Sequence, residues 1–206
     1  MWAGGRVRTS GPLRCGETAT KRSRVLSVQD KQGRSGPLTF IVMQHQILQR
    51  GQVVVDERQE IVYRAAASSA PGGQGAPIVK DPEAVPTADG EWQIDVSPVL
   101  LFRFSALTYN AHRIHYDRDY ARDVEGYPGL LTHGPLQALT MAEAARAGGT
   151  ADVGSPDFTY RLESPLFDHQ GMIVGAVREE ACVIATSVRD TGGRRTASGT
   201  LRDGDR

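Results

Sequence analysis

Cysteine and long apolar runs are scarce in this chain of 206 residues. Its two cysteines, Cys15 and Cys182, lie far apart and form no CxxC or metal-type spacing. We therefore expect idle thiols in a reducing compartment, with no disulfide framework. Purely apolar runs, such as 99–102, are far shorter than a membrane span, and the first residues contain no apolar segment of signal-peptide length. These absences predict a cytoplasmic protein without membrane insertion.

Net charge is also absent, because 24 lysines and arginines balance 24 aspartates and glutamates. A neutral chain creates no global field that would favour nucleic acid or an anionic membrane. No basic stripe interleaved with aromatic residues suggests nucleic acid either. Residues 1–34 are locally basic. We interpret them as a solvated face, and the alternative is attraction of an anionic, nucleotide-bearing ligand.

The chain divides into two halves around a linker. Residues 1–65 favour strands at 17–30, 38–49 and 53–64, with a shorter first strand near 6–10, and no segment has the length and period of a good helix. Residues 66–90 are rich in Ala, Gly, Pro and Ser and too poor in large apolar groups to form a core, so they predict a linker. Residues 91–206 form the second half.

The second half begins with helices and ends with strands. Ser97 before Pro98 predicts a helix to about residue 107, a loop follows at 109–116, and Asp117 can cap a short helix through residue 124. The long helix begins at Gly134 and ends at 148–149. Strands are predicted at about 158–163, 172–177, 181–189 and 195–201. The order predicts an α+β fold in which a curved antiparallel sheet wraps one long helix.

Three of the five histidines fall within about thirty residues of one another. His112 and His115 lie in the segment 104–117, and His133 directly precedes the long helix at Gly134. Histidines beside a helix start are typical of a proton-transfer site next to a backbone group that stabilises an anion. A structural histidine is the plain alternative for His115.

Four segments of the sequence are distinctive: LFRFSALTYNAHRIHYD at 101–117, VEGYPGLLTHGP at 124–135, MWAGG at 1–5 and GRSGP at 33–37. Together they resemble the MaoC-like hydratases and dehydratases of the hot-dog fold. The most similar branch contains mesaconyl-CoA hydratases and type 2 hydroxyacyl-thioester dehydratases. This resemblance implies a double hot dog, of which residues 1–65 supply an incomplete first half and 91–206 a catalytic second half. Because an incomplete half leaves apolar sheet surface uncovered, we expect a homo-oligomer, or a chain whose numbering begins inside a longer ancestral reading frame.

The resemblance also implies roles for three residues. His115 matches the catalytic histidine, and Asn110 stands where related hydratases have an acid. Since an amide cannot take a proton, His115 would act as the only general base while Asn110 orients the water. Gly134 matches the residue whose backbone N–H binds the thioester carbonyl, and a helix start suits an oxygen that gains negative charge.

Four further residues are candidates for substrate binding: His112, Arg113, Tyr109 and His133. His112 and Arg113 would suit a free carboxylate on a diacid acyl group, because Arg offers a planar fork. Each also has a structural alternative. His112 and Arg113 would hold the surface loop, Tyr109 and Tyr116 would pack, and His133 would fix the helix-opening turn by hydrogen bonding.

The expected activity is hydration of a 2-enoyl thioester, or the reverse dehydration of a 3-hydroxyacyl thioester, on coenzyme A or an acyl carrier. No prosthetic group is expected. A metal site made by His112, His115, His133 and Asp117 is a rival interpretation, although His-x-x-His in a loop lacks the spacing of common zinc motifs. The alternatives to a hydratase are a hot-dog thioesterase and a non-catalytic module that binds acyl thioesters.

Overall fold

The computed structural model describes residues 1–33, 36–64, 83–148 and 155–203. Its strands are β1 (Trp2–Thr9), β2 (Ala19–Gly33), β3 (Gly36–Gln49), β4 (Gln52–Arg64), β5 (Trp92–Ile94), β6 (Pro156–Leu162), β7 (Met172–Glu180), β8 (Val183–Arg189) and β9 (Arg195–Asp203). Its helices are α1 (Pro98–Thr108), α2 (Arg118–Asp123) and α3 (Gly134–Ala147), with 3-10 turns η1 (Arg113–His115) and η2 (Asp168–Gln170). None of the helices described is long and apolar enough to cross a membrane.

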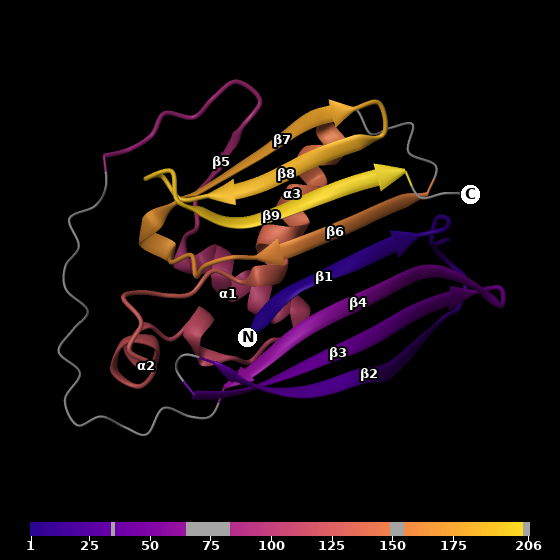
Figure 1. The fold of residues 1–206 in the computed structure, drawn as a ribbon, viewed down its shortest axis with the longest axis horizontal. Coiled ribbons are helices and arrows are strands. Elements are labelled where there is room, and N and C mark those ends of the chain that lie inside the picture. The colour runs from indigo at the N-terminus through magenta and orange to yellow at the C-terminus, as the bar shows by residue number, and fades with distance from the viewer. Residues whose placement is uncertain (34–35, 65–82, 149–154, 204–206) are drawn as a thin grey trace.

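All nine strands belong to one antiparallel sheet in the order β2-β3-β4-β1-β6-β9-β8-β7-β5 (Figure 1). The two halves join where β1 pairs with β4 on one side and with β6 on the other. The predicted strands of both halves are confirmed, with ends shifted by a few residues. The sequence did not predict the short edge strand β5, and the first strand begins at Trp2 and not near Arg6.

The two glycines of the segment MWAGG (1–5) are explained by the close packing of β1 against its neighbours. A Cβ atom on Gly5 would lie 2.6 Å from the Arg58 carbonyl oxygen and 2.7 Å from the Tyr160 hydroxyl. At Gly4 it would lie 2.7 Å from the Tyr160 carbonyl oxygen. Trp2 donates from its indole nitrogen to the same Tyr160 hydroxyl, at 2.8 Å. The two glycines therefore let β1 join the halves of the sheet at close range.

Gly5→Ala is expected to lower the free energy of unfolding by about 1–3 kcal/mol, because the added methyl group forces the backbone or Tyr160 to move. Gly11→Ala is the matched control, since a Cβ atom there meets nothing within 4 Å. Urea unfolding of both variants measures the difference. Equal stability of the two would show that β1 and β6 pack less tightly than described.

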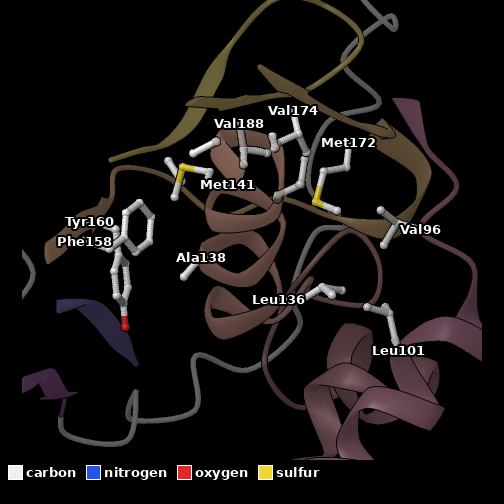
Figure 2. Close-up of a cluster of buried hydrophobic side chains, with 14 of the residues drawn as sticks. Val96, Leu101, Leu136, Ala138, Met141, Phe158, Tyr160, Met172, Val174 and Val188 are labelled. Atoms are coloured by element: carbon white, nitrogen blue, oxygen red, sulfur yellow. The ribbon is translucent and has the colours of Figure 1, made fainter. Parts of the chain in front are cut away.

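The long helix predicted from Gly134 is confirmed, and it lies on one face of the sheet. α3 packs mainly against β7, β8 and β9, and also contacts β1 and β6. Its buried side chains, such as Leu136 and Met141, meet Met172, Val174 and Val188 from the strands (Figure 2). This cluster is the main apolar core of the described residues, and it fixes where the first turn of α3 lies.

The predicted helix starts are confirmed at their caps. The Ser97 hydroxyl accepts a hydrogen bond from the Leu100 N–H, and the Asp117 carboxylate accepts one from the Tyr120 N–H. Each satisfies an orphan donor of the first helical turn. Within the expected loop 109–116 the chain forms the 3-10 turn η1, which the sequence did not predict.

The first half contributes strands only, among the residues described. No helix in the described part of the chain makes more than slight contact with β2, β3 or β4. Strand register places Val25 and Val28 on the face of the sheet that α3 occupies further along, and they are 55% and 59% exposed. Most of the expected linker 66–90 lies outside the described residues, and 83–90 contain no helix or strand.

Candidate active site

The candidate site lies where α1, η1, the loop before α3 and the first turn of α3 meet. Its centre is formed by histidine rings. The rings of His115 and His133 stack with centroids 3.7 Å apart and planes 16° apart, and His112 lies edge-on to His115 at 5.8 Å. The three clustered histidines of the sequence therefore come together in space.

His115 is held in one tautomer. Its side chain is 7% exposed, and its Nδ1 lies 2.7 Å from the backbone carbonyl oxygen of Leu131. A carbonyl oxygen only accepts, so Nδ1 must carry the proton and Nε2 keeps its lone pair. The lone pair that a general base requires is therefore on Nε2.

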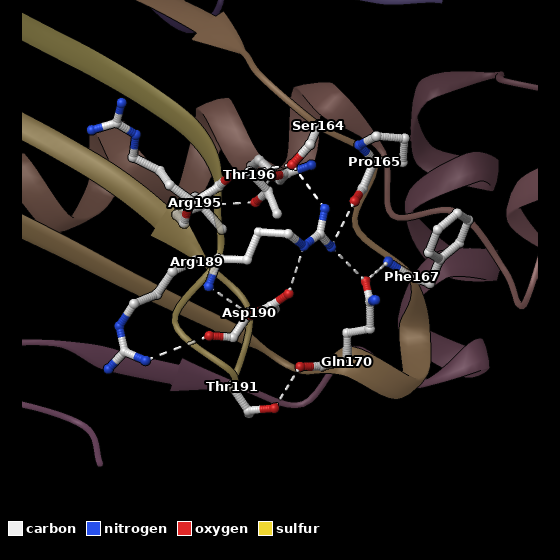
Figure 3. A network of polar contacts seen from close by, with 12 residues as sticks. Ser164, Pro165, Phe167, Gln170, Arg189, Asp190, Thr191, Arg195 and Thr196 are labelled. Atoms are coloured by element: carbon white, nitrogen blue, oxygen red, sulfur yellow. Dashed lines mark hydrogen bonds and ion pairs between the residues drawn. The ribbon is translucent and has the colours of Figure 1, made fainter. Parts of the chain in front are cut away.

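The Leu131 carbonyl that orients His115 belongs to a well-supported loop. Leu131 donates its N–H to the Ile114 carbonyl, forms a β-bridge with Phe167, and is flanked by backbone bonds from Thr132 to Leu166 and from Asp168 to Leu130. A second layer of polar contacts holds the segment 164–170 (Figure 3).

Arg194 is the centre of that layer. Its guanidinium donates to the Ser164 hydroxyl, the Pro165 carbonyl oxygen, the Gln170 side chain and the Asp190 carboxylate. The turn between β8 and β9 thus supports the loop on which His115 depends. Such support keeps a catalytic side chain close to its working geometry.

His133 is fully buried and does not play the structural role that we expected. Its side chain makes no cap hydrogen bond at the start of α3, so the prediction that it fixes the helix-opening turn was wrong. Its Nε2 lies 2.8 Å from the Ser105 hydroxyl on α1, and the centroids of the His133 and Phe104 rings are 4.9 Å apart in a T-shaped arrangement. Among the described residues, the Ser105 hydroxyl is the only hydrogen-bond partner of the His133 side chain.

Both buried rings are neutral at ordinary pH. The pKa of His115 is lowered to about 4, mainly by burial; the hydrogen bond to the Leu131 carbonyl opposes this shift, and the nearby His112 adds to it. Burial, followed by the neighbouring His115, lowers the pKa of His133 to about 3. Low dielectric surroundings disfavour the charged imidazolium, and two stacked rings disfavour a second charge.

These shifts predict that acid destabilises the fold. Both pKa values lie below the ordinary 6.5, so the unfolded chain binds up to two more protons as the pH falls from 6.5 towards about 4. Each extra proton changes the free energy of unfolding by about 1.4 kcal/mol per pH unit, so near pH 5 the loss reaches up to about 3 kcal/mol per unit. His115→Gln should halve this slope. Urea unfolding at several pH values measures it, and equal stability at neutral pH and about pH 5 would contradict the buried neutral pair.

Gly134 begins α3, as the sequence predicted, and no side chain caps this helix start. The first N–H groups of a helix lack partners within the helix and point outward along its positive end. A Cβ atom on Gly134 would overlap the Cδ1 atom of Leu162 and would lie 3.5 Å from the Trp2 Cβ. The absence of a side chain at Gly134 therefore lets Leu162 pack directly against the first residue of α3.

The other predicted site residues lie around this centre in different settings. The Asn110 Oδ1 accepts the His112 N–H at 3.1 Å, which closes the loop before η1. His112 is exposed and next to His115. Arg113 pairs with Asp117 at 2.6 Å, and its guanidinium lies 4.2 Å from the centre of the Tyr120 ring. Arg113 is thus engaged with α2.

The two tyrosines differ from the packing role that we expected. Tyr109 follows α1 in a left-handed conformation with φ 53°, and it is 96% exposed, so the prediction that it packs was wrong. Tyr116 is 39% exposed and donates its hydroxyl to the Ala111 carbonyl oxygen. The exposure of Tyr109 was not predictable, because Tyr109 directly follows a mainly apolar helix.

The described residues contain no group of three His, Cys, Asp or Glu side chains placed to hold a metal ion. The stacked arrangement explains why the ring nitrogens of His115 and His133 do not point at a common metal position. His115 points its Nδ1 at a carbonyl and His133 points its Nε2 at a hydroxyl, and parallel rings direct their nitrogens side by side and not at one point.

An apolar groove of about 490 Å³ begins beside the first turn of α3. One wall is a stripe of α3 made by Pro135, Ala138, Leu139 and Ala142, and the other comes from β1, β6 and β9 and includes Trp2, Val7, Phe158, Tyr160 and Leu201. Glu143 and Arg146, which pair at 2.9 Å, lie towards the end of α3. The groove thus extends along the helix from the residue after Gly134.

Ser105 is the polar site residue that the sequence did not predict. It lies 5% exposed in α1 with its hydroxyl against His133. The available signal was a small hydroxyl residue within a helical stretch, 101–107, that is apolar apart from Arg103, where a buried polar group requires a partner.

Comparison with known proteins identifies the family. A model described as hydroxyacyl-thioester dehydratase type 2 matches residues 1–168. The chain belongs to that family. It is 44% identical over 169 residues to the mesaconyl-C(4)-CoA hydratase of Chloroflexus aurantiacus, which covers 82% of this chain and 58% of the relative. It is 39% identical over 80 residues to the mitochondrial type 2 hydroxyacyl-thioester dehydratase of Schizosaccharomyces pombe, which covers 38% of this chain and 27% of that protein.

Solved structures show the fold of this chain. The chain superimposes on HtdX of Mycobacterium tuberculosis with a TM-score of 0.72 at 17% identity, over 99% of this chain and 76% of HtdX. A further M. tuberculosis protein, described as having a double hotdog fold, matches with a TM-score of 0.58 at 15% identity, over 98% of this chain and 74% of its own. The fold expected from the sequence, a double hot dog, is confirmed.

Proposed function

We propose that this chain carries the active site of a lyase that adds water to a 2-enoyl thioester or removes it from a 3-hydroxyacyl thioester. The observation that carries the proposal is His115, a buried neutral imidazole with Nδ1 fixed by a carbonyl and Nε2 left as a base, close to an uncapped helix start. The chain spans 58% of the Chloroflexus relative, so the activity is inferred for the site and not taken from that protein.

In the hydration direction, His115 Nε2 takes a proton from water while the hydroxide oxygen bonds to the β-carbon. The electron pair of the double bond moves to the thioester oxygen, where the Gly134 N–H and the positive end of α3 stabilise the enolate. The imidazolium then gives its proton to the α-carbon, which restores neutral His115. No prosthetic group enters this sequence of steps, and dehydration is the reverse.

The low pKa of His115 is compatible with this role. A base with a pKa of about 4 is fully unprotonated at neutral pH, although it is weak. As negative charge develops on the enolate, the opposite charge nearby favours the imidazolium and raises the pKa of His115 when the proton must be held. The base is thus strengthened by the substrate it acts on.

The remaining candidates are assigned within the same proposal. Asn110 orients the water through its amide nitrogen, since its oxygen is occupied by the His112 N–H. His112 is the exposed imidazole next to the base and contacts the substrate, and Tyr109 lies exposed at the end of α1 for the same purpose. Arg113 would bind a substrate carboxylate only by sharing its guanidinium with Asp117.

The apolar groove is the proposed place for the acyl chain. It begins at Pro135, the residue after the proposed N–H donor, and its walls are mainly apolar. Burial of an acyl chain along Ala138, Leu139 and Ala142 contributes about 0.8 kcal/mol per methylene group. Coenzyme A, or the equivalent arm of an acyl carrier, would remain outside the groove.

A single assay separates this proposal from a thioesterase and from a binding module. Crotonyl-CoA and mesaconyl-CoA are incubated with the protein while enoyl absorbance and free thiol are recorded together. Loss of the enoyl signal without thiol is the expected result. Release of thiol would identify a thioesterase, and no change in either signal would indicate a non-catalytic module. Both results would refute the lyase.

We also propose that the chain is a homo-oligomer in which a second copy covers the exposed apolar face of β2–β4. Val25 and Val28 lie exposed on that face. Apolar side chains exposed together on one face are stabilised by burial against another surface. Light scattering after size-exclusion chromatography should give at least a dimer, and Val28→Glu should shift it towards monomer. A monomeric unsubstituted protein would refute this assembly.

A further inference from the structure

The buried pair formed by Ser105 and His133 lies outside the proposed reaction steps but touches the proposed base directly. Ser105 comes from α1 and His133 from the loop before α3, 28 residues apart in sequence. Their polar contact of 2.8 Å is buried, and the His133 ring stacks on His115 at 3.7 Å. A chain of contacts therefore runs from α1 through His133 to His115.

His133 is held in this position at a cost in stability. Its Nδ1 is buried and has no hydrogen-bond partner among the described residues. A buried polar atom without a partner destabilises a fold, and an apolar ring of similar size would avoid that loss. Residues that persist at such a cost often serve function.

The contacts around His115 show what the arrangement achieves. The Leu131 carbonyl fixes one ring nitrogen of His115 through a single hydrogen bond. The His133 ring, whose plane is 16° from parallel, packs against one face of the His115 ring and so restricts its rotation. His133 itself is held by the Ser105 hydroxyl at 2.8 Å and by the Phe104 ring, whose centroid lies 4.9 Å away.

We infer that Ser105 and His133 are positioning residues that fix the plane of the His115 ring, and so aim its Nε2 at the substrate. Neither touches the reacting atoms. The inference rests on the proposed function, because it assigns a purpose to the orientation of the base. Small errors of placement matter in catalysis, since a displacement of about 1 Å can lower the rate by about 10²-fold.

Ser105→Ala tests the inference. We expect kcat for crotonyl-CoA hydration to fall by about 10- to 100-fold, while KM changes by less than about twofold, because the base is misaligned and the binding surface is intact. Ser105→Thr, which keeps a hydroxyl, should recover most of the lost kcat. Thr108→Ala is the matched control, since it removes an exposed hydroxyl from the same helix, where Thr108 bonds the Phe104 carbonyl.

Nuclear magnetic resonance of histidine-labelled protein supplies a readout that does not need turnover. In Ser105→Ala the ring signals of His115 should shift and broaden, while those of His45, which lies on β3, stay unchanged. If Ser105→Ala does not fold, Ser105→Cys has nearly the same volume with a much weaker hydrogen bond and should show the same changes.

A folded variant with kcat within twofold of the unsubstituted protein would overturn the inference, as would unchanged His115 signals. A loss of kcat that matches only the loss of folded protein would also overturn it, because it would indicate a structural role. If the unsubstituted protein turns over neither thioester, the proposed function fails, and the ring signals of His115 then decide the positioning role separately.

Discussion

His115→Gln is expected to lower kcat/KM for hydration of crotonyl-CoA by about 10²–10⁴-fold, because it removes the proposed general base. Glutamine can still donate its amide N–H to the Leu131 carbonyl, which occupies the present position of the Nδ1 bond. The substitution therefore separates proton transfer from support of the loop. Steady-state kinetics and circular dichroism on the same preparation measure activity and folding together.

His45→Gln is the matched control for this variant, because it makes the same chemical change on β3, where His45 contacts Ser23 in the first half of the chain. It should retain full activity. If folded His115→Gln kept more than about a tenth of the activity, proton transfer would have to occur elsewhere, since loss of general-base catalysis alone removes more than that.

Removal of the Gly134 N–H is expected to lower kcat by about 10²–10³-fold, the typical effect of losing one oxyanion donor. Gly134→Pro removes the donor, and proline suits the first position of a helix. The conformation of His133, φ −61° and ψ 131°, is also one that a following proline permits. A side chain at position 134 would overlap Leu162, so Leu162 must be shortened in the same variant.

The double variants Gly134→Pro/Leu162→Ala and Gly134→Ala/Leu162→Ala isolate the N–H. Both relieve the overlap with Leu162 and both add carbon at position 134, but only the alanine variant keeps the donor. The alanine variant should therefore be much more active than the proline variant. Equal activity of the two would mean that the start of α3 does not bind the thioester oxygen.

The local elements of this fold were predictable from short stretches of sequence. Ser97 and Asp117 cap helices as expected, and α3 runs from Gly134 to the glycine at 148, because capping and helix ends depend on neighbouring residues. The segments rich in β-branched residues became strands for the same reason.

The arrangement of those elements in space was harder to predict from the sequence. β6 pairs with β9 and β1, not with β7, and such non-local pairing is set by packing over the whole sheet. The role of the glycines in MWAGG could not be predicted, because it depends on their contact with Tyr160, which is distant in the sequence. The strand β5 is three residues long, too short to show a periodic pattern.

The clustering of the three histidines was predictable from the sequence, and their contacts were not. The roles of His115 and Gly134 come from the family resemblance and stay predictions. The partner of His133 was not identified, because a hydrogen bond between residues 28 positions apart leaves no local signature. The exposure of Tyr109 was missed because it depends on the left-handed turn that ends α1.

The most direct test of the account is a crystal structure of His115→Gln with bound crotonyl-CoA. We predict the thioester oxygen at hydrogen-bond distance from the Gly134 N–H, the β-carbon facing the side chain at position 115, and the acyl chain pointing towards Pro135. A thioester bound with its carbonyl away from the start of α3, or with its β-carbon out of reach of position 115, would contradict the account.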